Sequence, residues 1–346
     1  MDIDRIGKDV LEKGSPIVHA DGVLFVYSGK ADSVYLVGDY NSWERDDPMK
    51  KAPEKDLWYL KKDFPDNSRF DYKFVVDGNW ITDPNNKNMT PGGSGYNSTL
   101  IMPQYHSNYE RIIHSDVPRG TVAYNQDYFS NHLQETMKYH VYLPFGYDKT
   151  AARHILYALD GSDYLNFASA NLVFDYLIAQ GEIPKAVVVL VDPHERTKEY
   201  TLYEPYYDYV ITELLPFVES RYISGENGVD RTLMGVSWGG LTAIYLAANS
   251  NLFCRVLSQS GSFWPKEWLI FDILQEREIA HIRFCLQTGT IADTEEMNDV
   301  MYKVLKARGS IVDYMKYAES HSWGNWKGHM DEGLRKVFEG QNTHEN

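Results

Sequence analysis

The chain has 346 residues, of which 43% are hydrophobic and 14% aromatic, enough to form the cores of two domains. Its formal net charge of −15 at pH 7 argues against nucleic-acid binding, which needs a basic face. The two cysteines, Cys254 and Cys285, are too few for a disulfide framework. Each lies in an apolar stretch, so we expect two buried thiols.

The first 22 residues contain no charged stretch followed by a long apolar run, the pattern of a secretory signal. No apolar run in the chain approaches the roughly 20 residues that span a bilayer. The sequence therefore predicts a cytoplasmic protein with no membrane partner.

Up to about residue 102, short alternating runs are separated by turn residues such as Gly, Asn, Asp and Pro. This spacing predicts a small antiparallel β-sandwich, with a loop at 84–95. We assign residues 1–105 to this sandwich, 106–340 to a second domain and 341–346 to a frayed tail. The strand-like runs of the sandwich are 22–29, 33–40, 58–64, 69–78 and 98–102.

After residue 120, apolar runs alternate with long helical patterns, which predicts parallel strands joined by crossover helices in an open α/β sheet. Such sheets place their chemistry at the carboxyl ends of the strands. The predicted strands are 138–144, 154–161, 186–192, 231–237, 255–261, 283–289 and 312–319, and the predicted helices are 166–181, 205–222, 239–250 and 295–309.

The motif Gly-Val-Ser-Trp-Gly at 235–239 lies where a predicted strand becomes a helix. Gly235 and Gly239 remove side chains that would collide in a tight strand-to-helix turn, so Ser237 would project from the sheet as a nucleophile. The backbone N–H of Trp238 would point into the same space. Taken alone, the five-residue pattern is also common by chance.

A reactive serine needs a histidine base and an orienting carboxylate, which in this topology follow in the order Ser, acid, His. Of the late histidines, His321 directly follows a predicted strand, whereas His329 falls inside the next helix. We therefore predict His321 as the base; the alternative is a surface histidine near tryptophans.

The first carboxylate after the strand at 283–289 is Asp293, which we predict as the acid. Two alternatives stay open. Asp293 could be the N-cap of the helix that follows, with Glu296 completing a capping box, or Glu295 or Glu296 could be the acid.

A second oxyanion donor should come from the loop after an early strand. In the Asp160-Gly161-Ser162 turn, the glycine leaves the Ser162 N–H free for this role, although an ordinary turn is the alternative. The segment 194–198 begins like a zinc-protease helix but ends in Lys198, where a second histidine is required. We predict no metal and no cofactor.

Together these segments resemble the esterase branch of the α/β-hydrolases, which includes esterase D, feruloyl and acetyl-xylan esterases, mycolyltransferases and enterochelin (ferric-siderophore) esterases. The resemblance covers about residues 120–340, through segments such as "LYALDGSDY", "VDPHERTKEY", "GVSWGGLTA" and "SHSWGNW". It implies an α/β-hydrolase fold with Ser237 as nucleophile and His321 as base. Trp238 and Ser162 would then supply the oxyanion N–H groups.

The acid is where this chain departs from the family. Relatives often carry an Asp two residues after the Gly-Thr pair, a position held here by Ala292, and some siderophore esterases work with a Ser–His pair alone. The R-x-x-E of Arg196 and Glu199 looks most like the enterochelin-esterase subgroup. We expect this pair either to fix its loop or, with Asp160 and Trp323, to contact an acidic or polyhydroxyl substrate.

The N-terminal region resembles the glycogen-binding-type, early-set immunoglobulin-like modules, through "VYLVGDYNSW…YKFVVDGNWITDP". In sugar-binding members two tryptophans stack on glucose rings while Lys and Asn bind hydroxyls; Trp43, Trp80, Lys73 and Asn97 match those positions. The loop at 90–98 lacks the bulky apolar residue that grips a glucan, and many such modules dock onto a neighbouring active site instead. Trp80 could also simply pack beside a hairpin.

The leading hypothesis is a serine carboxylic-ester hydrolase whose partner is a small-molecule or carbohydrate ester. An acylated sugar or aromatic acyl ester ranks first as substrate and a siderophore trilactone second; acyl transfer would use the same machinery. The alternative of another class is a catalytically dead carbohydrate-binding scaffold. Chains of this type could also pair as homodimers.

Overall fold

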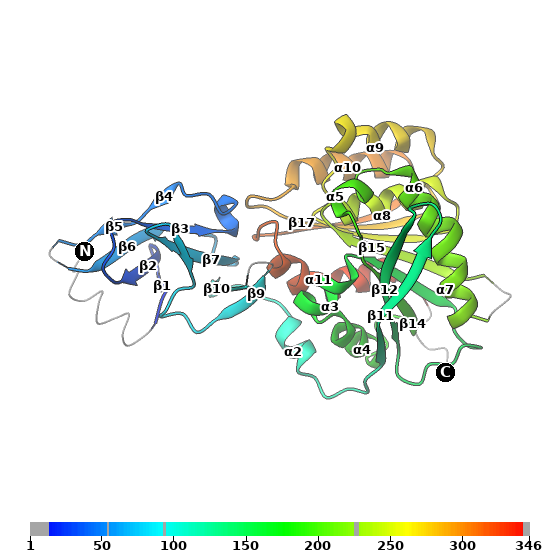
Figure 1. The fold of residues 1–346 in the computed structure, drawn as a ribbon, viewed down its shortest axis with the longest axis horizontal. Helices are drawn as coiled ribbons and strands as arrows, with labels where there is room; N and C mark the ends of the chain where they lie inside the picture. The colour runs from blue at the N-terminus through cyan, green and yellow to red at the C-terminus, as the bar shows by residue number, and fades with distance from the viewer. Residues whose placement is uncertain (1–13, 54, 93–94, 225–227, 342–346) are drawn as a thin grey trace. The chain divides into compact units, whose positions relative to one another are not determined.

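The computed structural model describes residues 14–53, 55–92, 95–224 and 228–341, which form two compact units (Figure 1). The first unit holds the chain up to His106 together with Gly289–Asp293 and Tyr317–Asn325. The second holds Ser107–Thr288, Thr294–Lys316 and the chain from Trp326 onward. Two short segments from the predicted second domain therefore belong to the sandwich unit. Of the predicted tail, 342–346 lie outside the described residues.

The N-terminal part of the first unit is the expected β-sandwich, drawn from blue to cyan in Figure 1. One sheet has the order β1 (Ile17–His19), β2 (Gly22–Ser28), β6 (Leu57–Lys62) and β5 (Lys50–Lys51). The other has the order β4 (Asp47–Pro48), β3 (Val34–Gly38), β7 (Arg69–Val76), β10 (Gly95–Ile101) and β9 (Met89–Gly92), with β8 (Asn79–Ile81) also paired to β7.

Strand β7 shows how the sandwich divides its side chains between two faces. Phe70, Tyr72 and Phe74 lie in the apolar core between the sheets. Because side chains alternate along a strand, Arg69 and Asp71 fall on the opposite, outer face. The predicted loop at 84–95 was wrong in part, since β9 pairs there with β10. A short edge strand forms by pairing and tolerates the proline at position 91.

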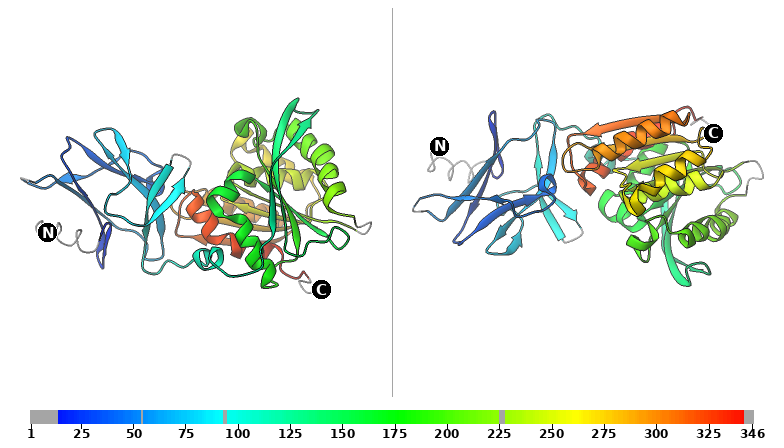
Figure 2. Two further views of the ribbon diagram at one scale, coloured as in Figure 1. Left: turned by 60° about the horizontal axis from the view of Figure 1, so that its bottom comes forward. Right: turned by 90° about the horizontal axis from the view of Figure 1, so that it is seen from above.

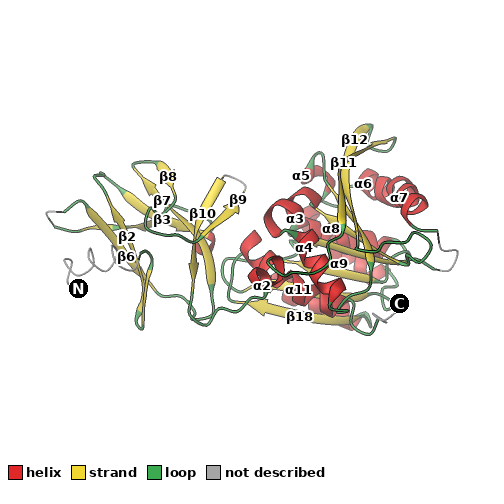
Figure 3. Ribbon diagram, turned by 90° about the horizontal axis from the view of Figure 1, so that it is seen from below, coloured by secondary structure: helices red, strands yellow, loops and turns green. Residues whose placement is uncertain are grey.

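The second unit contains an eight-stranded sheet, seen among its helices in Figures 2 and 3. All seven predicted strands are present, and the α/β expectation is confirmed. In sheet order the strands are β11 (Thr121–Ser130), β12 (Glu135–Leu143), β14 (Ala186–Val191), β13 (His154–Leu159), β15 (Asp230–Val236), β16 (Arg255–Gln259), β17 (Arg283–Gly289) and β18 (Ile311–Tyr317).

The strands from β14 to β17 pair in parallel, whereas β11 and β12 pair antiparallel at one edge. Strand β11 was not predicted from the sequence. Its outward side chains are largely exposed, so it lacks the apolar run that marked the central strands.

The helices include two breaks inside segments that were predicted as single helices. Ser169, with φ 45°, separates α3 (Gly161–Ala168) from α4 (Ala170–Ala179). A π-helical stretch, Tyr209–Leu214, separates α6 (Glu204–Asp208) from α7 (Leu215–Tyr222). The remaining helices are α2 (Tyr109–Ile113), α5 (Arg196–Glu199), α8 (Trp238–Asn249), α9 (Pro265–Glu276), α10 (Glu295–Ala307) and α11 (Trp323–Val337).

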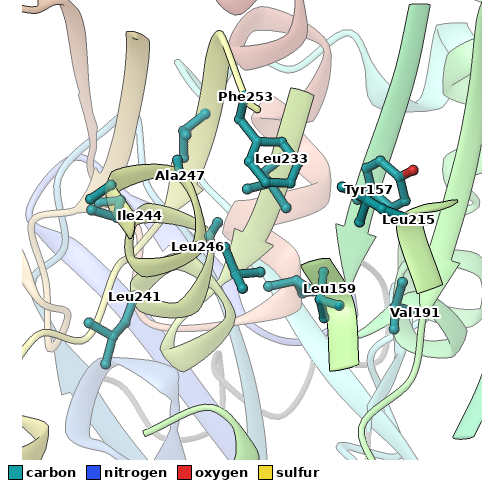
Figure 4. Packing of buried hydrophobic residues seen from close by; sticks show 14 of the residues in the cluster. Tyr157, Leu159, Val191, Leu215, Leu233, Leu241, Ile244, Leu246, Ala247 and Phe253 are labelled. Carbon is teal, nitrogen blue, oxygen red and sulfur yellow. The ribbon is translucent and has the colours of Figure 1, made fainter. Parts of the chain in front are cut away.

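The core of the second unit lies against the central strands, which are buried on both faces as parallel strands require. Figure 4 shows Leu159 of β13 and Leu233 of β15 beside the buried side chains of α8, among them Leu246. This packing fixes the strand-to-helix junction between β15 and α8. Among the described residues, no helix is long and apolar enough to cross a membrane.

Candidate active site

Ser237 lies in the tight turn between β15 and α8. Its φ of 56° and ψ of −122° are strained for a residue with a side chain. A Cβ atom on Gly235 would lie 2.4 Å from the carbonyl carbon of Gly239, so position 235 must be glycine for the two elements to approach. Trp238 opens α8, and its N–H is one that the helix itself leaves without a partner.

Ser262, which was not predicted from the sequence as a site residue, also lies at this turn. Its Oγ lies 3.2 Å from Ser237 Oγ, and its N–H donates to the Ser237 carbonyl at 3.1 Å. The sequence contained a signal for this residue, because the loop after β16 lies at the same sheet edge as the loop after β15. Polar residues directly after β16 were therefore candidates.

His321 and Asp293 lie together in the first unit. Asp293 Oδ1 is 2.7 Å from His321 Nδ1; the Asp293 side chain is fully buried, and that of His321 is 30% exposed. Since an ionised carboxylate can only accept, Nδ1 must carry the proton in this bond. In a neutral imidazole, Nε2 then keeps its lone pair for a base.

The loop of Asp293 holds the carboxylate in place. Asp293 Oδ2 accepts the N–H of Gly289 at 2.5 Å, and Ala292 turns the chain with a φ of 48°. Helix α10 takes Thr294 as its N-cap residue, so Asp293 does not cap it. The alternative acid Glu295 instead contacts Lys316 at 2.9 Å.

The predicted oxyanion residue Ser162 belongs to a separate polar cluster in the second unit. Its N–H donates to Asp192 Oδ1 at 2.6 Å and its hydroxyl to Asp192 Oδ2 at 2.5 Å. For the Ser162 N–H to serve a substrate oxyanion, Asp192 would have to release it. Burial opposes ionisation of Asp192, but hydrogen bonds from His140 and Ser162 hold its pKa below the usual value.

His140 gives this cluster the composition of a second Ser–His–Asp set, since its Nε2 lies 2.9 Å from Ser162 Oγ. Its Nδ1 accepts the N–H of Asn125 at 3.0 Å, which places the proton of the neutral ring on Nε2. The nitrogen nearest the serine therefore has no lone pair to act as a base. We interpret this cluster as structural.

Arg196 pairs with Asp160 rather than with Glu199. Its Nε and Nη2 donate to the two carboxylate oxygens at 2.7 and 2.8 Å, while Asp160 is 3% exposed. Arg196 also lies over the Trp238 ring, 5.8 Å from its centre. Glu199 is buried and accepts the N–H groups of residues 194 and 195, an arrangement that fixes this loop.

A cavity of about 340 Å³ opens beside the Arg196–Asp160 pair. Most of the residues that line it have polar or charged side chains. Burial and the neighbouring Asp160 raise the pKa of Asp163, in this lining, to about 6. The lining residues are Thr136, Lys138, Asp160, Ser162, Asp163, Asp192, Pro193, His194 and Arg196.

Aromatic side chains gather near Ser237 in the second unit. Trp238 packs edge-on against Trp264, with ring centres 6.1 Å apart. Trp264 is 42% exposed and Trp268 46% exposed. Residues 266–268 all have left-handed φ values, a strained path that leads into α9. The predicted substrate residue Trp323 is half-buried at the start of α11.

The two tryptophans matched to glycan binding lie close together on the sandwich. The ring centres of Trp43 and Trp80 are 6.3 Å apart, and Trp80 is 44% exposed. Lys73 is buried at 9%, while Asn97 is half-buried on β10. Of the four positions, Trp80 is thus open aromatic surface, Trp43 is half-buried beside it, and Lys73 is largely covered.

In the described part of the chain, no group of three or more His, Cys, Asp or Glu side chains is arranged so that it could hold a metal ion.

Comparison with known proteins connects this geometry to two families. Residues 130–337 match the family model described as "Putative esterase". Residues 22–105 match the model described as "Glycogen recognition site of AMP-activated protein kinase". The first match spans more than half of the chain, and the second coincides with the β-sandwich.

Among curated proteins, the uncharacterized protein YjcH of Bacillus subtilis (strain 168) is 26% identical over 240 residues, covering 64% of this chain and 99% of YjcH. The iron(III) enterobactin esterase of Dickeya dadantii (strain 3937) is 29% identical over 248 residues, covering 65% of this chain and 56% of that protein.

Two solved structures share the fold. The enterobactin esterase FES from Shigella flexneri aligns over 94% of this chain and 96% of its own, at 21% identity and a TM-score of 0.80. The feruloyl esterase module from Clostridium thermocellum aligns over 70% of this chain and 96% of its own, at 20% identity and a TM-score of 0.57. The second unit thus has an enterobactin esterase-like α/β-hydrolase fold. The chain belongs to the "Putative esterase" family, and this membership supports activity as a carboxylic-ester hydrolase.

Proposed function

We propose that the protein is a serine esterase that works through a covalent acyl-enzyme. Ser237 Oγ attacks the acyl carbon of the ester while His321 Nε2 takes the hydroxyl proton. The carbonyl oxygen becomes an oxyanion that accepts the Trp238 N–H and a second N–H, for which Ser162 is the candidate if Asp192 releases it on substrate binding. When the tetrahedral intermediate collapses, His321 returns the proton to the leaving alcohol. Water then attacks the acyl-Ser237 ester while His321 takes a proton from the water. His321 returns this proton to Ser237 Oγ when the acid leaves.

The observation that carries this proposal is the Asp293–His321 hydrogen bond. It fixes the tautomer in which Nε2 is the basic nitrogen, on the residue that the order Ser, acid, His had singled out. The strained turn at Ser237 supports it, since a φ of 56° at a serine costs free energy that an ordinary turn would avoid.

For the acyl group we favour an aromatic acid. Trp238 and Trp264 offer flat apolar surface next to Ser237, on which an aryl ring would stack in an offset or edge-on geometry. The alcohol would be a sugar or a siderophore backbone. The Dickeya dadantii relative, an iron(III) enterobactin esterase, supports the second of these.

The test is turnover of p-nitrophenyl acetate, followed by a panel of feruloyl, acetyl-xylan and siderophore esters compared by kcat/KM. Ser237→Ala and His321→Ala should each lower kcat by at least about 1,000-fold. Mutants that match the wild-type rate would refute the serine mechanism. A wild type that cleaves none of these esters would favour the alternative of a catalytically dead scaffold.

A second candidate function, glycan binding by the sandwich, is favoured by the Trp43–Trp80 pair and by the glycogen-recognition match. Stacking on a sugar ring typically needs such an exposed aromatic face. A glycan pull-down with the Trp43→Ala/Trp80→Ala double variant tests it. Unchanged retention would contradict stacking at this face.

A further inference from the structure

The outer face of β7 carries a buried ionic cluster that a free sandwich sheet would not need. Arg69 and Asp71 are 6% and 4% exposed and form an ion pair of 2.8 Å. Thr90 and Thr99 add hydrogen bonds, at 2.9 Å to Arg69 and 2.7 Å to Asp71. Asp39 joins the cluster by accepting the Asp71 N–H at 3.0 Å. We call Asp39, Arg69 and Asp71 the brace.

The loop that carries His321 covers the brace. A Cβ atom on Gly324 would lie only 1.7 Å from Arg69 Nη1, so the guanidinium packs directly on the Gly324 backbone. Ser322 hydrogen-bonds Asp39 through its side chain, and the charge of Glu319 acts on Arg69. The brace therefore contacts the loop directly after His321, and its cation is attracted by the charge of Glu319 just before His321.

The Asp293 loop is tied to the same surface. The N–H of Ile291 donates to the Glu319 carbonyl at 3.1 Å, and the N–H of Thr290 donates to the Tyr317 carbonyl at 2.8 Å. The Ile291 side chain packs against the apolar core of the sandwich. Both partners of the Asp293–His321 hydrogen bond thus rest on the N-terminal sandwich.

The contact between the brace and the His321 loop depends on buried charges that must stay paired. Arg69 is a buried cation that faces the carboxylates of Asp71, Asp39 and Glu319, and Glu319 is 1% exposed. Removing a buried cation leaves its partner carboxylates in a site of low polarity, which strongly disfavours that packing. If the contact served only to shield the loop from water, apolar side chains would be sufficient.

We infer that the sandwich is a working part of the esterase site: Arg69 and Asp39 are positioning residues that hold the His321 loop in its reactive placement. The inference rests on the proposed function, in which His321 is the base. Since a displacement of about 1 Å at a reacting group can cost about 100-fold in rate, a weakened brace should lower kcat without removing any catalytic atom.

The test uses the full chain with p-nitrophenyl acetate and the variants Arg69→Gln, Gly324→Ala and their combination. We expect each single change to lower kcat by about 10- to 100-fold with KM within about twofold. Because Gln is shorter than Arg, it makes room for the added methyl. Gly324→Ala should therefore cost less than about threefold in the Arg69→Gln background. The control Lys62→Gln, which removes the Lys62–Asp47 ion pair between β6 and β4, should stay within about twofold of the wild type.

Losses that simply multiply in the double variant, or a folded Arg69→Gln with wild-type kcat, would overturn the inference. If Arg69→Gln fails to fold, Ser322→Ala replaces it, because this change removes only one hydroxyl at the brace. The NMR chemical shifts of the His321 ring give a readout that needs no turnover, and the brace predicts altered shifts in Arg69→Gln. If His321→Ala keeps full activity while Arg69→Gln still moves the His321 resonances, the proposed function fails but the contact between the brace and the His321 loop stands.

Discussion

The turn of Ser237 and the loops of His321 and Asp293 are held in different ways. Ser237 lies between β15 and α8, which are adjacent in sequence, and the close approach of Gly235 to Gly239 shapes its backbone. His321 and Asp293 lie on two loops that pack on strands of the N-terminal sandwich. The nucleophile is positioned by local backbone geometry, and the base by packing across long stretches of chain.

This difference predicts how substitutions in each place lower activity. A change at the turn should act through backbone strain, within one unit. A change at the loops should act through hydrogen bonds and buried charge, and it should depend on the sandwich. Substitutions at the turn and at the loops should therefore differ in their effects on activity and on stability.

Asp293→Asn should lower kcat by about 1,000- to 10,000-fold, the size of effect that follows when an acid can no longer hold its histidine in the right tautomer. The amide can donate to Nδ1, which moves the ring proton to Nε2 and removes the basic lone pair. Steady-state kinetics of the purified variant measures this. The control is Glu295→Gln, which breaks only the contact with Lys316 and should stay within about twofold. If Glu295→Gln lowered kcat more than Asp293→Asn, Glu295 and not Asp293 would be the catalytic acid.

Gly235→Ala should lower kcat/KM by about 100-fold and the free energy of unfolding by about 1–3 kcal/mol, because the added methyl forces β15 away from α8. Gly146→Ala separates the two effects. That position has open space for a Cβ but a φ of 68°, so it should cost about 1 kcal/mol of stability and no activity. Equal losses of activity in both variants would show that the turn at Ser237 is not specially constrained.

The contrast also explains what could be predicted from sequence. The Ser237 turn was predictable because its determinants, two glycines flanking a serine at a strand end, lie within five residues. His321 and Asp293 could be placed in order after their strands, and the structure brings the two together. The brace could not be predicted, because Arg69 and Asp71 occupy ordinary alternating positions of a strand. Only the three-dimensional contact with Gly324 gives them a role.

In the second unit, the burial of side chains along each strand determined which strands could be predicted from the sequence. The central strands were predictable as apolar runs, whereas β11 was missed because its partly exposed side chains have no such run. The pairing of Arg196 with Asp160 was also missed, because the two residues lie on different loops at one sheet edge.

Arg196→Gln should lower the free energy of unfolding by about 2 kcal/mol, since it leaves the buried Asp160 carboxylate without its cation. This expected loss of stability is smaller than the usual cost of breaking a buried ion pair, because Arg196 is itself 36% exposed. Asp160→Asn in the same chain should restore most of the loss. Urea unfolding measures all three proteins, and Lys198→Gln, which breaks an exposed pair with Glu195, is the control with no expected change. A double variant as unstable as Arg196→Gln would mean that the pair does not stabilise the fold.

The brace should make the sandwich sensitive to pH in a way that the Ser237 turn is not. Burial and the neighbouring Asp71 raise the pKa of Asp39 to about 7, against about 3.9 in an unfolded chain. Between these two values the folded state holds a proton that the unfolded state has lost, so the free energy of unfolding should fall as pH rises from about 4 to about 7 and level off above. Asp39→Asn should flatten this slope by about 1 kcal/mol per pH unit, below the limit of about 1.4 kcal/mol for one proton. Urea unfolding of both proteins at pH 5, 6, 7 and 8 measures the difference, since other titrating groups contribute equally to each. Parallel curves would mean that Asp39 is already ionised in the folded protein, with Arg69 supplying the compensating charge.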